Sequence, residues 1–140
     1  MFHREKIIQK LSDIHSSDKT ALEKFRLILK FKFAHIEKNP ALVMVIFSET
    51  SFQYCSVLSG VVNKILEQRA KKITTLIKSG QQEGSIRNDL DVEQLAIIVL
   101  GGIRSTILTW KLSGFKGGLK DDGKKLWKTL EILLKKPTNE

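Results

Sequence analysis

The sequence predicts an all-α protein of six helices and no strands, and three observations lead to this prediction. Apolar residues recur at spacings of three and four along most of the chain, as they do on the buried face of a helix. Only two prolines occur, Pro40 and Pro137, and both lie near expected helix ends. With 140 residues, of which 41% are hydrophobic, the chain is long enough to fold around a core of its own. We therefore expect residues 1–140 to form a single domain.

The first three helices are separated by clear breaks. We expect helices over 2–15 and 19–38, with Ser16-Ser17-Asp18 ending the first and capping the second. Asn39-Pro40 marks the next boundary, because proline disfavours helix at the residue before it and suits the first turn of the next helix. The third helix, over 40–52, opens with a run of apolar residues and should be short and buried.

The last three helices are longer, and glycines mark their junctions. The fourth is expected over 55–83, followed by Gly84, which suits the left-handed conformation after a helix end. Asp91 and Gln94 have the spacing of a capping pair for the fifth helix, which should run to about residue 112. The sixth is expected over 119–135, with Gly123 weakening its first turns.

The fifth helix is apolar on every side between Leu95 and Ile103. A helix that buries only one face keeps a polar stripe, so this one is expected to have two apolar neighbours: its own domain and a second copy of the chain. Gly101-Gly102 costs on the order of 1 kcal/mol per glycine in helix propensity, which favours close approach of another backbone. The expected homodimer interface comprises Ile98, Val99, Gly102, Ile103, Thr106, Trp110, Leu126, Trp127, Leu130 and Leu133. The alternative is that these residues fill the core of a monomer.

Two motifs carry a resemblance to a known family: Asn39-Pro40 before the short helix, and the junction Ile77-x-x-Gly80-x-x-x-Gly84-x-Ile86-Arg87-x-Asp89-x-Asp91, followed by Ala96, Gly101 and Trp110. This pattern resembles the C-terminal half of TetR-type (tetracycline-repressor-like) transcriptional regulators over nearly the whole chain. The resemblance implies a six-helix bundle whose last two helices pair with their counterparts in a dimeric four-helix bundle. It also implies a small-molecule effector in a helical pocket, and operator DNA bound by an upstream helix-turn-helix. No such module precedes Met1, so residues 1–16 are expected to be a connector to a missing DNA-binding domain.

An apolar or amphipathic effector would occupy a mostly apolar pocket. The residues expected to line it are Phe33, Met44, Phe47, Phe52, Tyr54, Leu58, Val62 and Leu66, with Arg69 able to anchor an anionic head group. The alternatives are that the apolar members are plain core and that Arg69 pairs with a carboxylate while its stem covers apolar surface.

Other functional classes find no support in the sequence. The three histidines and Cys55 have no partners at metal-ligand spacing, and no phosphate loop or nucleophile elbow is present, so we expect no metal, no cofactor and no enzyme. The lysines behind the net charge of +9 are scattered among several helices, which does not favour a nucleic-acid surface. Without an upstream helix-turn-helix, this chain is not expected to bind an operator specifically. No apolar run approaches the roughly 20 residues of a membrane span, and we expect a soluble, cytoplasmic protein without a membrane partner.

Two functions remain after this reading. The first is the effector-sensing and dimerisation domain of a TetR-type repressor, in which ligand binding is coupled to DNA release. The alternative is a stand-alone helical module that binds another protein and senses no effector.

Overall fold

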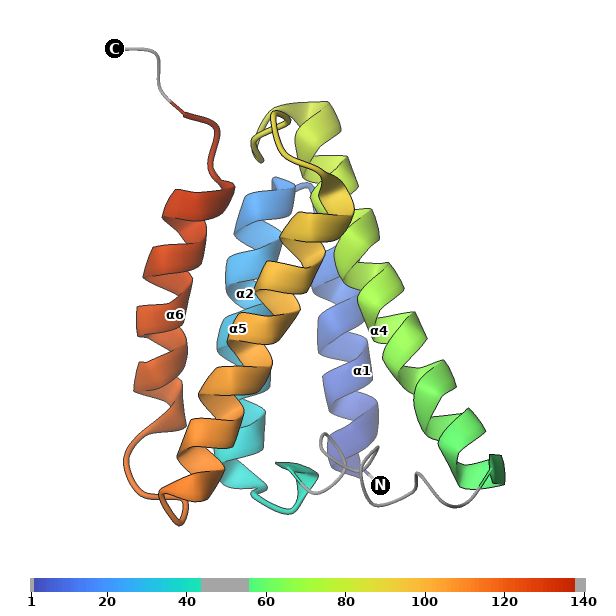
Figure 1. Cartoon of the computed structure of the whole chain (residues 1–140), viewed down its shortest axis with the longest axis vertical. Coiled ribbons are helices and arrows are strands. Elements are labelled where there is room, and N and C mark those ends of the chain that lie inside the picture. Colours follow the sequence, from blue (N-terminus) through green and yellow to red (C-terminus); the bar gives the residue numbers. More distant parts are fainter. Residues whose placement is uncertain (1, 44–55, 138–140) are drawn as a thin grey trace.

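The computed structural model describes residues 2–43 and 56–137, and of residues 2–8, 56–59, 61–63, 65 and 66 it describes the backbone alone. Within these ranges five helices are present: α1 (Phe2–Ser16), α2 (Ala21–Lys38), α4 (Ser56–Glu83), α5 (Val92–Leu112) and α6 (Leu119–Leu134) (Figure 1). The same ranges hold no strand beyond one isolated β-bridge, between Ile86 and Lys135. The all-α prediction is confirmed, and the helix expected over 40–52 falls largely outside the described residues.

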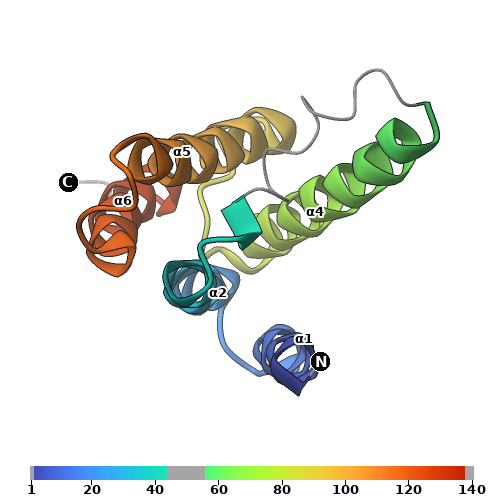
Figure 2. The same cartoon turned by 90° about the horizontal axis from the view of Figure 1, so that it is seen from below.

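Helix α2 is the centre of the bundle. It packs against α1, α4 and α6, whereas α5 packs against α4 and α6 from the opposite side (Figure 2). The buried side chains of α2 recur at helical spacing, from Ala21 through Phe25 and Leu29 to Phe33 and Ile36. A stripe of this kind is typical of a helix that buries one face, and in α2 it is enclosed by three neighbouring helices.

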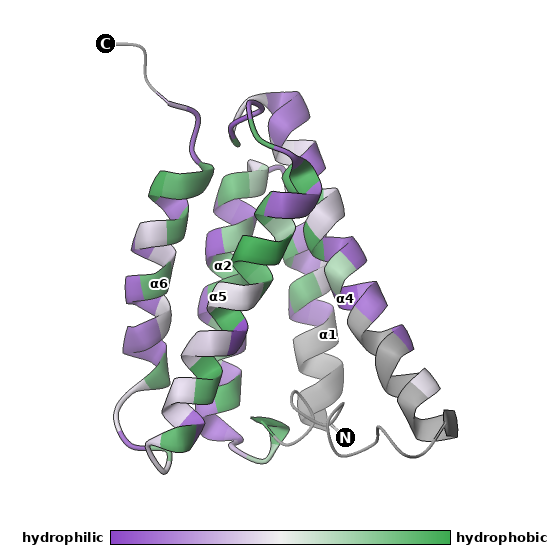
Figure 3. Ribbon diagram, in the orientation of Figure 1, coloured by the Kyte–Doolittle hydropathy of each residue, from purple (hydrophilic) through white to green (hydrophobic). Residues whose placement is uncertain are grey.

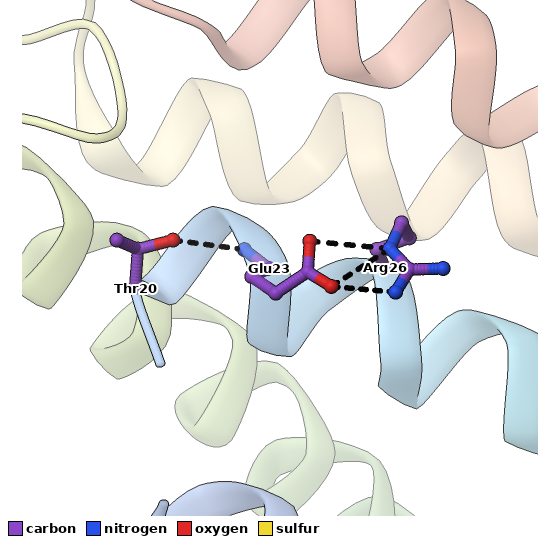
Figure 4. A network of polar contacts seen from close by, with 3 residues as sticks. All are labelled: Thr20, Glu23 and Arg26. Atoms are coloured by element: carbon purple, nitrogen blue, oxygen red, sulfur yellow. Dashed lines mark hydrogen bonds and ion pairs between the residues drawn. The ribbon is translucent and has the colours of Figure 1, made fainter. Parts of the chain in front are cut away.

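The start of α2 is capped differently from the expectation. Thr20, rather than the Ser16-Ser17-Asp18 segment, is the N-cap: its hydroxyl accepts from the backbone N–H of Glu23 at 3.2 Å (Figure 4). The carboxylate of Glu23 turns away to pair with Arg26, and these contacts lower the pKa of Glu23. Glu83, the last residue of α4, accepts from the backbone N–H of Ala21 at 2.6 Å. The end of α4 therefore supplies a second cap to α2.

The junction between α4 and α5 has the geometry that its glycines predict. Gly84 adopts φ +91° and donates its N–H to the Gly80 carbonyl at 2.9 Å, the left-handed cap of a helix C-terminus. Gly80 leaves room for Ile86, because a Cβ at residue 80 would lie 2.6 Å from Ile86 Cγ1 and 3.0 Å from Ala21 Cβ. Asp91 caps α5 through the backbone N–H of Gln94 at 3.2 Å.

The same junction is tied to the end of α6. The backbone N–H of Arg87 donates to the Leu134 carbonyl at 2.7 Å, next to the Ile86–Lys135 bridge. Two side-chain contacts hold the turn: Gln81 Nε2 donates to the carbonyls of Arg87 and Leu90, each at 3.0 Å. The linker is thus a fixed part of the bundle.

Glycine also determines how closely α6 approaches α2. Gly123 is buried, and a Cβ there would lie 2.7 Å from Cδ2 of Phe33. The sequence favours the view that Gly123 loosens the start of the last helix; in the structure it lies inside α6 and admits the ring of Phe33. The cost in helix propensity is offset by the contact between the two helices.

Candidate functional site

The face formed by α5 and α6 exposes large apolar side chains. The exposed members, which we call the apolar belt, are Ile97, Ile98, Leu108, Leu112, Ile132 and Leu133. Ile97 is 61% and Ile98 53% exposed, although a side chain of this size normally contributes to stability by being buried. Figure 3 shows hydrophobic residues along much of α5.

Part of the belt follows helical spacing along α5. Ile97, Gly101, Ser105, Leu108 and Leu112 are separated by three or four residues and so share one face of α5. A groove of ≈ 420 Å³ runs between this helix and α6, lined by Ser105, Thr106, Thr109, Asp122, Lys125, Leu126 and Thr129. Gly101 is exposed, and no atom lies within 4 Å of the position its Cβ would take. A second backbone can therefore approach α5 closely at Gly101.

The structure divides the predicted interface residues into two groups. Ile98 and Leu133 are exposed, and Gly102, Ile103, Thr106 and Leu126 are half-buried, with Ile103 and Leu126 packed against the core. The others, Val99, Trp110, Trp127 and Leu130, are buried within this single chain. Their side chains belong to its core, the alternative that the sequence left open, because the fifth and sixth helices also pack on each other and on α2 and α4.

Four members of the belt were absent from the prediction: Ile97, Leu108, Leu112 and Ile132. The spacing of Ile97, Leu108 and Leu112 on one face was the available signal. It could not be separated from the buried face by pattern alone, since both faces of this helix are apolar.

The predicted effector pocket is only partly within the described structure. Met44, Phe47, Phe52 and Tyr54 lie outside the described residues, and so do the side chains of Leu58, Val62 and Leu66. Phe33 is 2% exposed and packs against Gly123 of α6. Arg69 is exposed on α4. The pocket therefore stays a prediction.

The backbones of α4 and α5 are not parallel (Figure 1). Helices α4 and α5 lie close together at the Gly84 junction and diverge toward Ser56, as both views show (Figures 1 and 2). Leu58, Val62 and Leu66 all belong to the first half of α4, where this divergence is largest.

The charge near Arg69 is strongly positive. Lys32 is half-buried on α2, and burial, together with the charges of Arg69 and Lys72, lowers its pKa. A charged group that loses water without gaining a counter-ion is destabilised. In the described part of the chain, no group of three or more His, Cys, Asp or Glu side chains comes together that could hold a metal ion.

By length and composition, α5 is also the one described helix that could cross a membrane. In the sequence, the longest unbroken run of apolar residues is too short to predict such a span. A single helix of this kind is weak evidence for one, because the core helix of a soluble protein has the same composition. In this chain, 28% of its most apolar stretch is buried.

Comparisons with known proteins agree with this fold. Residues 3–133 match the family described as "YsiA-like protein, C-terminal region". No curated protein matches the chain.

Three solved regulators share the architecture. The transcriptional regulator FadR from Bacillus subtilis, solved in complex with stearoyl-CoA, superposes with a TM-score of 0.77 and 25% identity over 92% of this chain and 70% of its own. The fatty acid degradation regulator FadR from Bacillus halodurans superposes with a TM-score of 0.76 and 18% identity, over 91% of this chain and 65% of its own. The ketosteroid transcriptional regulator KstR2 of Mycobacterium tuberculosis superposes with a TM-score of 0.75 and 18% identity, over 94% of this chain and 66% of its own. This chain thus spans about two thirds of the length of such regulators.

Proposed function

The chain belongs to the family of YsiA-like protein C-terminal regions, a TetR-type domain, and on this premise we propose that it is the effector-sensing and dimerisation domain of a transcriptional regulator. The family match over residues 3–133 is the observation that carries the proposal. The three structural neighbours are all regulators, which favours a binding function over an enzymatic one. We place this domain in the cytoplasm, where such a regulator would meet its operator.

The proposed effector is a long-chain acyl thioester. The neighbour at 25% identity was solved with stearoyl-CoA, an amphipathic molecule with a long apolar chain. In this chain the apolar part would lie between α4 and α5, where the two helices diverge and where Leu58, Val62 and Leu66 are placed on α4. Met44, Phe47, Phe52 and Tyr54 complete the proposed lining.

The proposed homodimer forms through the apolar belt. Pairing α5 and α6 with their counterparts would cover Ile97, Ile98 and Leu133, and it would explain why a helix with so little of its apolar stretch buried is stable in water. A permanent interface of this kind would bury on the order of 2,000 Å² in total.

The proposed mechanism is a population shift. Effector binding favours one packing of α1 and α4 over another, and only a difference in affinity for the two packings can move the equilibrium. Helix α1 packs chiefly against α2, through Leu11, Ile14 and the ammonium of Lys10, which lies 4.7 Å from the ring centre of Phe31. We propose that α1 moves an upstream helix-turn-helix and that effector binding thereby releases operator DNA.

Thermal unfolding of the purified chain with and without ligand tests the effector proposal. Stearoyl-CoA at 100 times its dissociation constant should add about 2.7 kcal/mol of apparent stability and raise the Tm, whereas free coenzyme A should add much less. If neither stearoyl-CoA nor a panel of amphipathic molecules shifts the Tm, the effector proposal fails. That result would favour the alternative, a helical module that binds another protein.

A further inference from the structure

A cleft of ≈ 500 Å³ lies where the end of α1 meets α2 and α4. We call it the cationic cleft, and its lining residues are His15, Lys24, Gln68, Lys71, Lys72, Thr75, Leu76 and Ser79. Figure 2 shows the backbones of these three helices, with α1 and α4 beside α2. The cleft lies on the side of α2 away from the apolar belt, so it is separate from the proposed dimer face.

Lysines from two helices and a histidine from a third line this cleft. Lys24 comes from α2, Lys71 and Lys72 from α4, and His15 from the last turn of α1. Among the side chains that the structure describes, no carboxylate lines the cleft. The remaining polar groups are the hydroxyls of Thr75 and Ser79 and the amide of Gln68, all of which can donate hydrogen bonds to an anion.

The lysines around the cleft disfavour a positive charge on His15. Burial, followed by the charges of Lys72, Lys24 and Lys32, lowers the pKa of His15. Lys32 on α2 is half-buried, and burial together with the charges of Arg69 and Lys72 lowers its pKa as well. Because the protein holds these cations together, a bound anion would relieve the repulsion and gain several charge-assisted hydrogen bonds.

Two carboxylates on the same helices are engaged elsewhere. Glu23 pairs with Arg26, and Glu83 accepts from the backbone N–H of Ala21. Lys24 donates one hydrogen bond to the carbonyl of His15 at 2.9 Å, which leaves two of its three ammonium protons for a ligand. The cleft therefore presents donors without an internal anion among its lining residues.

We propose that the cationic cleft binds a phosphate-bearing anion, held by Lys24, Lys72 and His15 with help from the Thr75 and Ser79 hydroxyls. Such a ligand bridges α1 and α4, which otherwise meet mainly through α2. Its phosphates come either from a free anion or from the head group of an effector whose apolar part lies elsewhere. The inference stands without the proposed effector.

Calorimetric titration of the chain with inorganic pyrophosphate tests the site. The matched variants are Lys72→Gln and Lys24→Gln in the cleft and Lys124→Gln on the exposed face of α6, each of which removes one positive charge. Each cleft variant should weaken pyrophosphate binding about tenfold, since each loses charge-assisted bonds to the anion. Lys124→Gln should change it by less than about twofold. Thermal melting of each variant confirms that it is folded.

A second readout is independent of affinity. Saturation with pyrophosphate should raise the pKa of His15, measured from its ring proton resonances, because the anion offsets Lys24, Lys32 and Lys72. The proposal is overturned if pyrophosphate does not bind at millimolar concentration, if all three variants weaken binding equally, or if the His15 titration does not move.

Further titrations distinguish the source of the phosphates from the effector proposal. If Lys72→Gln weakens stearoyl-CoA and pyrophosphate binding by the same factor, the cleft holds an effector head group. If only pyrophosphate binding weakens, the cleft takes a separate anion. Pyrophosphate binding without any stearoyl-CoA binding would support the cleft and reject the acyl effector.

Discussion

Gly80 shows how a single residue sets the spacing of three elements. It lies on α4 at the point where Ile86 of the linker and Ala21 of α2 both approach the backbone. Ile86 is 1% exposed, so it has no room to move aside. A glycine in a helix normally costs stability, but here it permits close packing that a larger residue would prevent.

Replacing Gly80 with alanine should therefore destabilise the chain by about 1–2 kcal/mol, because overpacking exceeds the gain in helix propensity. The control is Gly60→Ala in the same helix, where nothing lies within 4 Å of the added Cβ. That change should stabilise the chain by about 0.5–1 kcal/mol. Urea unfolding measures both, and equal stabilities for the two variants would contradict the packing account.

At the scale of helices, the start of α2 shows how two candidate N-cap residues compete. Asp18 and Thr20 are both residues that favour an N-cap position, and Thr20 is the one whose hydroxyl meets the backbone N–H of Glu23. Its backbone is extended, as a cap requires, with φ −64° and ψ 157°. Thr20 is followed three residues later by Glu23, which was the sequence signal for the true start.

Thr20→Ala should cost about 1 kcal/mol of unfolding free energy, because the hydrogen bond to Glu23 N–H is lost. For a chain of this size that corresponds to a fall in Tm of about 3 °C. Asp18→Ala, which alters the residue that sequence reasoning placed at the cap, should leave the Tm within about 1 °C. A larger effect for Asp18 than for Thr20 in calorimetric melting would place the cap two residues earlier.

At the scale of the whole molecule, the apolar belt has the largest consequence. Ile98→Glu should convert a dimer into a monomer at micromolar concentration, because the proposed interface cannot bury an unpaired carboxylate. Leu90→Glu is the matched control, since Leu90 is also exposed but lies in the linker outside α5 and α6. Sedimentation velocity distinguishes the two. A monomeric parent chain, or a dimeric Ile98→Glu variant, would reject the proposed interface.

Gly101→Ala offers an independent check of the same face. Within one chain the added methyl group meets nothing within 4 Å, so it should make α5 more stable. If the backbone of a partner packs against Gly101, the same change should weaken association.

The sequence predicted the helices well because their breaks are chemically explicit. The bounds of α4, α5 and α6 agree with expectation to within one residue, since Gly84, Asp91 and Pro137 leave few alternatives. The assignment of side chains to core or surface was less successful. Trp110 and Trp127 are buried in one chain, whereas Ile97 and Leu112 are exposed, and a helix that is apolar all round gives no periodicity by which to separate them.

The cationic cleft was not foreseen for a different reason. His15, Lys24 and Lys72 are far apart in the sequence and come from three helices, so no spacing along the chain relates them. Only the packing of α1 and α4 around α2 brings their charges together. Long-range electrostatic sites of this kind depend on tertiary structure and leave no local pattern.

The contact between Glu83 and the first backbone N–H of α2 gives the bundle a mechanical property. One carboxylate joins the last turn of α4 to the turn from which α1 departs, so the two ends form a shared pivot. Any rotation of α4 about its long axis must carry that pivot with it or break the bond.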